Sequence, residues 1–408
     1  MLLRSPWELY ALWAALDEAF GRRMPFTRQL AMEALRVGRV GEERLARGLR
    51  EGRAFRGLLR DEEPLRLVLW DLPVTQMQPP RVPLHWEPPE LPTDDALAAW
   101  LGLELGPLRA FADLQDRARH HPPAWRNYQH RWIGRRLIEA PKARLKHVQR
   151  RVLHGILDAL VVHPAAHGFV RGRDRRSHAA PHVGHEVVAR VDLARFFPSI
   201  HRRRVTGLFE AMGYPRRVAR LLAGLCAART PPDVVEAGPA DAPVRYDAPH
   251  LPQGAPTSPA VANALCWRLD QRLSARATAS GHVYSRYADD LTISGPRRGM
   301  RALVAAVQVI AADEDFVVAA DKTRVMHQSE QQRVTGIVVN AQPGVPRRER
   351  ERLEAILVNC GRTDPAAQNR DGHPDFAAHL RGRVAAVGAV NARHGEKLLA
   401  LWQAVDWG

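Results

Sequence analysis

The stretch "VYSRYADDLTISG", residues 283–295, places two adjacent aspartates, Asp289 and Asp290, between runs of strand-forming residues. Two such runs separated by a short polar segment are typical of a β-hairpin. A third aspartate, Asp192, ends the β-branched run "EVVARVDL". Singly, each aspartate fits an ordinary strand end or turn. Together they predict a sheet whose strand ends form a concentrated negative site, which is costly unless a divalent cation neutralises it.

Carboxylates grouped in this way suit phosphoryl transfer. Two Mg²⁺ ions held by them can activate an attacking hydroxyl and stabilise a leaving pyrophosphate oxygen, and Mn²⁺ is the alternative ion. Because neighbouring strand positions face opposite sides, we expect Asp289 to be the principal ligand beside Asp192, and Asp290 to bind less directly.

The charge of the chain identifies a class of partner. A formal net charge of +16 over 408 residues favours nucleic acid, ahead of an anionic membrane surface. The sequence has no run near the roughly 18–20 apolar residues of a membrane span, and its N-terminus lacks a signal-peptide pattern. Cys226, Cys266 and Cys360 are widely spaced and leave an odd one over, which indicates a cytoplasmic protein.

Apolar spacing divides the chain into a helical part and a mixed part. Residues 1–70 predict helices, and the many prolines of residues 71–95 predict a linker. Helical spacing resumes to about residue 120. From Trp125 onward strand-like runs alternate with helical ones, which predicts an α+β body, and residues 345–408 return to helix.

Two segments on either side of the first aspartate predict local structure. Leu137–Ile138 is expected to be a short strand that ends at Pro141, before a basic amphipathic helix. In "DLARFFPSI", Phe197 lies five residues after Asp192, where its ring would press against a nucleotide sugar and reject a 2′-OH. The alternative is that Phe196 and Phe197 both belong to the core.

A third segment, "LPQGAPTSPAVANAL", predicts a proline-shaped loop that leads into a helix. Gln253 in this loop offers both a donor and an acceptor, and the following helix start directs backbone N–H groups towards an anion. Gln253 and Gly254 are therefore candidates for contact with an incoming nucleotide.

Several motifs together resemble those of reverse transcriptases. "YADD" resembles their Y-x-D-D box, "DLARFF" their first aspartate motif and "LPQGAPTSP" the motif that follows it in bacterial enzymes. "DKTRV" and "VTGIVVN" resemble later motifs, while "IEAPKARLKHVQRRVLHGIL" and "HGFVRGRDRRSHA" resemble fingers motifs. The resemblance runs in order from about Arg135 to Asn340, which is half of the chain.

Among bacterial groups, the chain most resembles retron reverse transcriptases. That group has a V-T-G triplet, here Val334 to Gly336, and an N-A-x-x-H motif, which here reads "HAAPH" with His178 in place of the Asn. The resemblance implies an α+β right-hand polymerase. Its expected parts are a helical N-terminal extension (1–120), fingers (121–190), a palm (191–340, with a fingers insertion near 205–250) and a thumb (341–408).

The resemblance also implies roles for individual residues. The Mg²⁺ ligands are Asp192, Asp289 and Asp290. Nucleotide contacts fall on Arg136, Phe197, Gln253 and Gly254. Lys322 either protonates the leaving pyrophosphate or binds phosphate, with a plain surface lysine as the alternative. Contacts with template or RNA fall on Arg171, Arg173, His182, Val334, Thr335 and Gly336.

A retron enzyme is expected to bind its own noncoding RNA (msr-msd type), prime from the 2′-OH of a guanosine and consume dNTPs. The product is DNA joined to RNA, with host RNase H trimming the template and a separate effector protein serving anti-phage defence. Basic clusters at 347–352 and 381–383 would bind the RNA, or are solvated helix faces. The rivals are an intron-like reverse transcriptase with a conventional 3′-OH primer and a non-catalytic RNA-binding scaffold.

Overall fold

The computed structural model describes residues 27–37, 76–239 and 248–407, and the isolated positions Glu8, Leu12, Leu16, Leu49 and Tyr246. The chain divides into two compact units, Met1–Gln76 and Met77–Gly408. In the first unit the helix α2 (Thr27–Val37) buries Leu30, Ala31 and Ala34 on one face. The rest of the helical region expected over residues 1–70 lies outside the described residues, as do residues 71–75 of the linker.

The second unit begins with an extended segment that leads to two short helices. Proline-rich residues 77–93 form no helix, and helices α5 (Asp94–Leu101) and α6 (Leu105–Ala112) follow. The Thr93 side chain caps α5 by accepting a hydrogen bond from the amide of Ala96. Apolar side chains of both helices join the main core. The larger unit therefore starts at Met77, well before the boundary near residue 120 that the sequence suggested.

A hairpin and a helix follow; the strand before Pro141 and the helix after it are as predicted, and the partner strand β1 is an addition. Strands β1 (Tyr128–Ile133) and β2 (Arg136–Pro141) pair antiparallel, and α7 (Ala143–Gly155) begins two residues after the proline. Proline lacks the N–H that a continuing strand ladder needs, so the strand ends there. Short 3₁₀ helices lie around this region: η2 (Ala118–His120), η3 (Pro123–Trp125) and η4 (Leu157–Ala159).

An antiparallel four-stranded sheet in the order β4-β5-β3-β6 forms the centre of the second unit. Its strands are β3 (Val187–Leu193), β4 (Val283–Tyr287), β5 (Asp290–Gly295) and β6 (Val318–His327). The predicted hairpin around the adjacent aspartates and the predicted strand before Asp192 are both confirmed. Together with the surrounding helices this sheet gives the expected α+β class.

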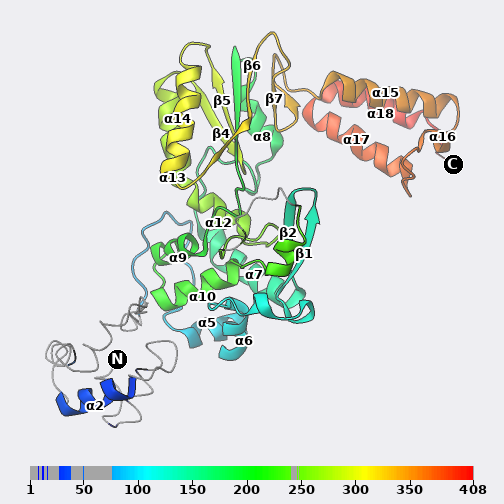
Figure 1. Ribbon diagram of the computed structural model, residues 1–408. Helices are drawn as coiled ribbons and strands as arrows, with labels where there is room; N and C mark the ends of the chain where they lie inside the picture. The colour runs from blue at the N-terminus through cyan, green and yellow to red at the C-terminus, as the bar shows by residue number, and fades with distance from the viewer. Residues whose placement is uncertain are drawn as a thin grey trace. The chain divides into compact units, whose positions relative to one another are not determined.

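The two faces of this sheet are covered differently (Figure 1). Helices α13 (Trp267–Ala279) and α14 (Met300–Asp313) pack on one face, where Val191, Leu291 and Ile293 enter the main core. On the other face lie the short helix α8 (Arg175–Ala179) and the 3₁₀ turn η5 (Ala180–His182). Strand residues alternate between these faces, so one hairpin supplies side chains to both.

Between β3 and β4 the chain makes a helical excursion. It comprises α9 (Arg202–Ala211), α10 (Arg216–Cys226), α11 (Pro232–Glu236) and α12 (Ser258–Leu265). Helix α10 packs against α9, α7 and α6, and so joins this excursion to the start of the unit. Of the insertion expected near 205–250, residues 240–245 and 247 lie outside the described residues.

After the sheet, a tight hairpin leads to helices that form their own core. Strands β7 (Arg333–Val334) and β8 (Ile337–Val338) are joined by Thr335 and Gly336, both with positive φ, as a type I′ turn requires. Helices α15 (Arg347–Arg362), α16 (Pro365–Gln368), α17 (Phe376–Val390) and α18 (Ala392–Gln403) follow. Leu353, Leu357, Leu380 and Leu398 are among the buried residues of this separate core. Among the described helices, none has the length and apolar character that a membrane crossing requires.

Candidate active site

The three aspartates meet at one end of the four-stranded sheet. Tyr287 pairs with Asp290, so Ala288 and Asp289 form the two-residue turn of the β4–β5 hairpin. Asp290 pairs with Asp192 across β5 and β3. The amide of Leu193 donates to the carbonyl oxygen of Asp289 at 2.9 Å, which ties the turn to the end of β3. The hairpin thus brings together residues that are about a hundred positions apart in the sequence.

The site holds more negative charge than its surroundings stabilise. Burial, and then the carboxylate of Asp192, raise the pKa of Asp289. Burial also raises the pKa of Asp290, against the opposing effect of the Arg190 guanidinium. Asp290, not Asp289, is paired with Asp192 in the register, and Asp289 lies in the turn and not on a strand. The alternation argument therefore does not apply to Asp289, and its role as the principal ligand beside Asp192 stays a prediction.

Two protein cations lie on this cluster. The Nζ of Lys322, on β6, is 2.8 Å from Asp192 Oδ1, and its side chain is 54% exposed. The guanidinium of Arg190, two residues before Asp192, donates to both carboxylate oxygens of Asp290, with Nε 3.1 Å from Oδ2. Neither cation contacts Asp289 in these ion pairs.

The donor set fits a hard divalent cation, which prefers carboxylate oxygens. Burial and the neighbouring carboxylates raise the pKa of Asp289, and a cation bound there would offset the repulsion between the carboxylates. In the described part of the chain, however, no three His, Cys, Asp or Glu side chains already converge as metal ligands. Binding at Asp192 requires Lys322 to move away, and its exposed side chain is free to do so.

The expected nucleotide contacts lie around the same end of the sheet. Phe196 is buried and stacks on Phe316 at 5.8 Å, so it is the core residue of the pair, while Phe197 is half-buried. Arg136 is exposed at the start of β2, and its positive charge lowers the pKa of Asp289 against the larger effect of burial. The charge of Arg136 therefore reaches Asp289, whereas Phe197 packs against the core and lies 6.3 Å, centroid to centroid, from the ring of Phe169.

The loop with Gln253 and Gly254 is held against strand β2. The amide of Glu139 donates to the Gln253 carbonyl at 2.9 Å. Gly254 has a φ of 139°, and a Cβ there would lie 3.0 Å from the Glu139 carbonyl oxygen, so glycine suits this close approach. The fully buried Glu139 carboxylate also binds His250 Nε2 at 2.9 Å and Thr230 Oγ1 at 2.8 Å. Burial acts to raise the pKa of Glu139, but these partners hold it below its usual value.

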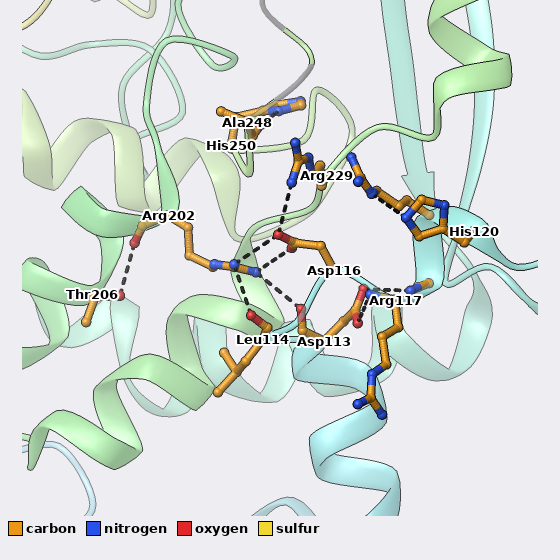
Figure 2. Close-up of polar contacts among 12 residues, drawn as sticks. Asp113, Leu114, Asp116, Arg117, His120, Arg202, Thr206, Arg229, Ala248 and His250 are labelled. Carbon is orange, nitrogen blue, oxygen red and sulfur yellow. Dashed lines mark hydrogen bonds and ion pairs between the residues drawn. The ribbon is translucent and has the colours of Figure 1, made fainter. Parts of the chain in front are cut away.

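A second charged network stands beside this one (Figure 2). Asp116, which follows α6, accepts from Arg202 at 2.9 Å and lies 3.7 Å from a nitrogen of Arg229. Arg202 also donates to the Asp113 carbonyl at 3.2 Å. Because Arg229 precedes Thr230 of the Glu139 network, these ion pairs connect the segment after α6 to the network that holds the Gln253–Gly254 loop.

His182 and Val334 do not have the RNA contacts expected of them. His182 is fully buried, with Nδ1 2.7 Å from Ser294 Oγ and Nε2 2.6 Å from Ser285 Oγ. Val334 is also fully buried and packs with Ala179 and other apolar residues. These side chains are unavailable to RNA, and they support the β4–β5 hairpin and β7 instead.

The two motifs that suggested the retron group touch each other. His178 Nδ1 lies 3.4 Å from Thr335 Oγ1, and the His178 ring is 5.7 Å from that of Tyr287. Burial lowers the pKa of His178 to about 3 and that of His182 well below its ordinary value, so both rings are neutral. In the second motif Thr335 is half-buried and Gly336 is exposed at the tip of the turn, and in the first motif Ala180 and Pro181 are exposed.

The two arginines of the fingers motif differ. Arg171 is exposed and stays a candidate for the template backbone. Arg173 Nη1 instead donates to the carbonyl oxygens of His163 and Pro164, both at 3.0 Å. The Nη1 of Arg173 therefore fixes its own loop, and its contact with the template stays a prediction.

Sequence reasoning missed a buried ion pair directly behind the aspartates. Arg286 and Asp270 are both fully buried, with Nη2 2.7 Å from Oδ2 and Nε 2.8 Å from Oδ1. Arg286 Nη1 also donates to the carbonyl of Ala288 in the turn at 3.1 Å. The alternation of strand residues would have pointed Arg286 into the core, where an arginine needs a carboxylate partner.

Comparison with known proteins identifies the family. The family model "Reverse transcriptase (RNA-dependent DNA polymerase)" matches residues 132–339. The retron Mx65 reverse transcriptase of Myxococcus xanthus is 41% identical over 75% of this chain and 70% of its own length. The retron Mx162 reverse transcriptase of the same organism is 40% identical over 76% of this chain and 66% of its own length. The retron Ec86 reverse transcriptase of Escherichia coli is 30% identical over 65% of this chain and 74% of its own length.

The fold and the carboxylate site thus define an RNA-directed DNA polymerase, a class whose domains use divalent metal ions. Within that class, the chain belongs to the retron-type reverse transcriptases.

Proposed function

We propose that this enzyme binds its own structured noncoding RNA, primes from the 2′-OH of a guanosine and makes multicopy single-stranded DNA joined to RNA. The observation that carries the proposal is the aspartate cluster at the sheet end, in a chain 41% identical to a retron reverse transcriptase. The net charge of +16 suits a protein that holds RNA, cDNA and dNTPs together. Host RNase H, a separate effector, anti-phage defence and a cytoplasmic location complete the proposal.

The proposed cofactor is a pair of Mg²⁺ ions, or Mn²⁺ in their place, with Asp192, Asp289 and Asp290 as ligands. When bound, the metal supplies Lewis-acid activation of the attacking hydroxyl and of the leaving pyrophosphate. The Nζ of Lys322 lies 2.8 Å from Asp192 Oδ1. From this position beside the proposed metal ligands, its ammonium would bind or protonate the pyrophosphate.

The remaining contacts follow from position. Phe197, half-buried five residues after Asp192 in the chain, limits the space for a 2′-OH, and the Gln253–Gly254 loop flanks the nucleotide. Arg136 lies where its charge reaches the carboxylates, which suits a triphosphate contact. Arg171, Thr335 and Gly336 remain proposed RNA or template contacts because they are not buried.

The unit would then divide as a right hand. The β1–β2 hairpin and α7 correspond to fingers (121–190), the four-stranded sheet to the palm (191–340, with the excursion near 205–250) and α15–α18 to the thumb (341–408). Exposed arginines at 347, 348, 352 and 381 make the thumb the proposed surface for the noncoding RNA.

The retron reaction is tested by the nucleic acid that copurifies with the full chain. Sequencing before and after treatment with a debranching enzyme should reveal DNA joined 2′–5′ to a single guanosine of an RNA encoded nearby. Unbranched cDNA alone would favour the intron-like rival with a 3′-OH primer.

The catalytic assignment is tested by Asp289→Ala combined with Asp290→Ala. Because the metal ligands are lost, cDNA synthesis should fall by at least ~10³-fold while RNA binding persists. The matched control is Asp321→Ala, an exposed aspartate on the same sheet next to Lys322, which should leave synthesis unchanged. If the double variant still makes cDNA, the aspartates are not the catalytic centre.

A further inference from the structure

Phe169 combines a strained backbone with an exposed ring. Its φ of 59° lies in the left-handed region that favours glycine, and the residue is 57% exposed. A bulky residue rarely adopts this backbone, and an exposed ring gains little from packing in return. Folding alone therefore does not account for a phenylalanine here.

The loop that carries Phe169 is fixed to the β4–β5 hairpin. The amide of His167 donates to the carbonyl of Arg286 at 2.7 Å. A Cβ on Gly168 would lie 2.6 Å from the amide nitrogen of Ala288, so the two backbones approach more closely than any other residue allows. Phe169 is thus held at a set position beside the turn that carries the aspartates.

The ring of Phe169 lies near two other aromatic rings of the candidate site. Its centroid is 6.3 Å from that of Phe197 and 6.4 Å from that of Tyr287. Phe197 is the proposed neighbour of the incoming sugar, and Tyr287 adjoins the catalytic turn. Two residues after Phe169, exposed Arg171 provides a positive charge for a phosphate. The loop therefore presents an aromatic face and a cation together, the combination that binds a nucleotide of a nucleic-acid strand.

We propose that Phe169 stacks on the template base that pairs with the incoming nucleotide. Every base has a π face, so such a contact serves any template sequence, as a polymerase requires. Because the loop fixes the position of the ring, the ring fixes the position of the stacked base. Arg171 contacts the adjoining phosphate. This contact rests on the polymerase activity and on the proposed template side of the fingers loop, and it does not depend on retron priming.

The test uses the full chain bound to an RNA template and a dideoxy-terminated DNA primer, so no chemistry occurs. The RNA carries 2-aminopurine at the first unpaired position, and dTTP is added to form the ternary complex. We expect stacking to quench the probe in the wild type. Phe169→Leu and Phe169→Ala should restore its fluorescence and weaken dTTP binding roughly 10-fold. Unchanged quenching in both variants would overturn the proposal.

Two controls separate this role from a structural one. Phe169→Gly relieves the left-handed backbone, so we expect it to unfold at a temperature equal to or above that of Phe169→Ala while losing the quenching equally. Trp125→Ala removes an aromatic residue that is 78% exposed outside the site, and should change neither signal. The measurement is repeated with 2-aminopurine at the primer terminus. If substitution of Phe169 changes the fluorescence there but not at the template position, the assignment is also overturned. Because the primer is blocked, failure here is distinct from failure of the retron proposal, which is read from branched DNA.

Discussion

The two faces of the four-stranded sheet hold charge in opposite ways. On the face covered by α13 and α14, the Asp270–Arg286 pair is fully buried and saturated with hydrogen bonds. On the other face, Asp192 and Asp290 hold Lys322 and Arg190 in half-exposed pairs, and Asp289 has a raised pKa. A buried pair with complete bonding has one arrangement, whereas an exposed pair exchanges partners easily. The first arrangement fixes the hairpin, and the second can rearrange its ion pairs at lower cost.

The polar face is itself divided. Near the turn it carries the charged cluster, and farther along the hairpin His182 joins Ser285 to Ser294 as a neutral bridge. The charged groups described on this face therefore lie near the turn, and the neutral histidine bridge lies farther along the hairpin.

The largest effect on stability should come from breaking the buried pair. Arg286→Met leaves Asp270 buried without its cation, which should lower the free energy of unfolding by about 3–5 kcal/mol. Adding Asp270→Leu removes the stranded charge and should recover part of that loss. Denaturant titration measures both. If Arg286→Met alone is as stable as the wild type, the pair does not stabilise the hairpin. The matched control is Arg272→Met. Arg272 lies on α13, the helix that carries Asp270, and forms more exposed ion pairs.

A smaller effect should come from pH. Burial lowers the pKa of His178 to about 3, so the unfolded chain binds more protons than the folded chain below the ordinary histidine value of about 6.5. This contribution is fully present above about pH 6.5 and is lost as the pH falls towards 3. His178→Asn, the residue of the related motif, should weaken the acid dependence by about 2 kcal/mol between pH 6.5 and 4.5.

Unfolding temperatures at several pH values measure this difference. The control is His147→Asn, which alters an exposed histidine of α7. Equal acid dependence in the wild type and in His178→Asn would mean that His178 is not held neutral by the fold.

The smallest change in stability should come from the charged face. Lys322→Ala and Lys397→Ala each remove an exposed ion pair, with Asp192 and Glu354 respectively, and should cost under about 1 kcal/mol. Only Lys322→Ala should slow nucleotide addition, by ~10²-fold or more if it acts on pyrophosphate. Single-turnover primer extension compares them. If the two variants add nucleotides at equal rates, Lys322 has no role in catalysis and is a plain surface lysine.

Local patterns predicted much of the fold. The strand before Asp192, the hairpin around Asp289 and the break at Pro141 followed from β-branched runs and proline, which act over a few residues. The ordered motifs also pointed to the family that the comparisons show. These features depend on residues that are neighbours in the chain.

Partners distant in the chain were not predictable. His182 meets serines 103 and 112 residues away, so its motif gave no sign that it would be buried. The same holds for Asp270 with Arg286, which are 16 residues apart on a helix and a strand. Phe169 was missed because its signal is a backbone angle, which the one-letter sequence does not carry. Tertiary packing decides such contacts.

The two-residue turn of Ala288 and Asp289 also limits how this gene can vary. Tyr287 and Asp290 are paired across it, and strand side chains alternate with a period of two. A single inserted codon would turn every later residue of β5 to the opposite face, so that Asp290 would enter the apolar core and Leu291 would face the site. A point mutation in this turn alters one side chain, whereas a change of one residue in its length exchanges the two faces of β5.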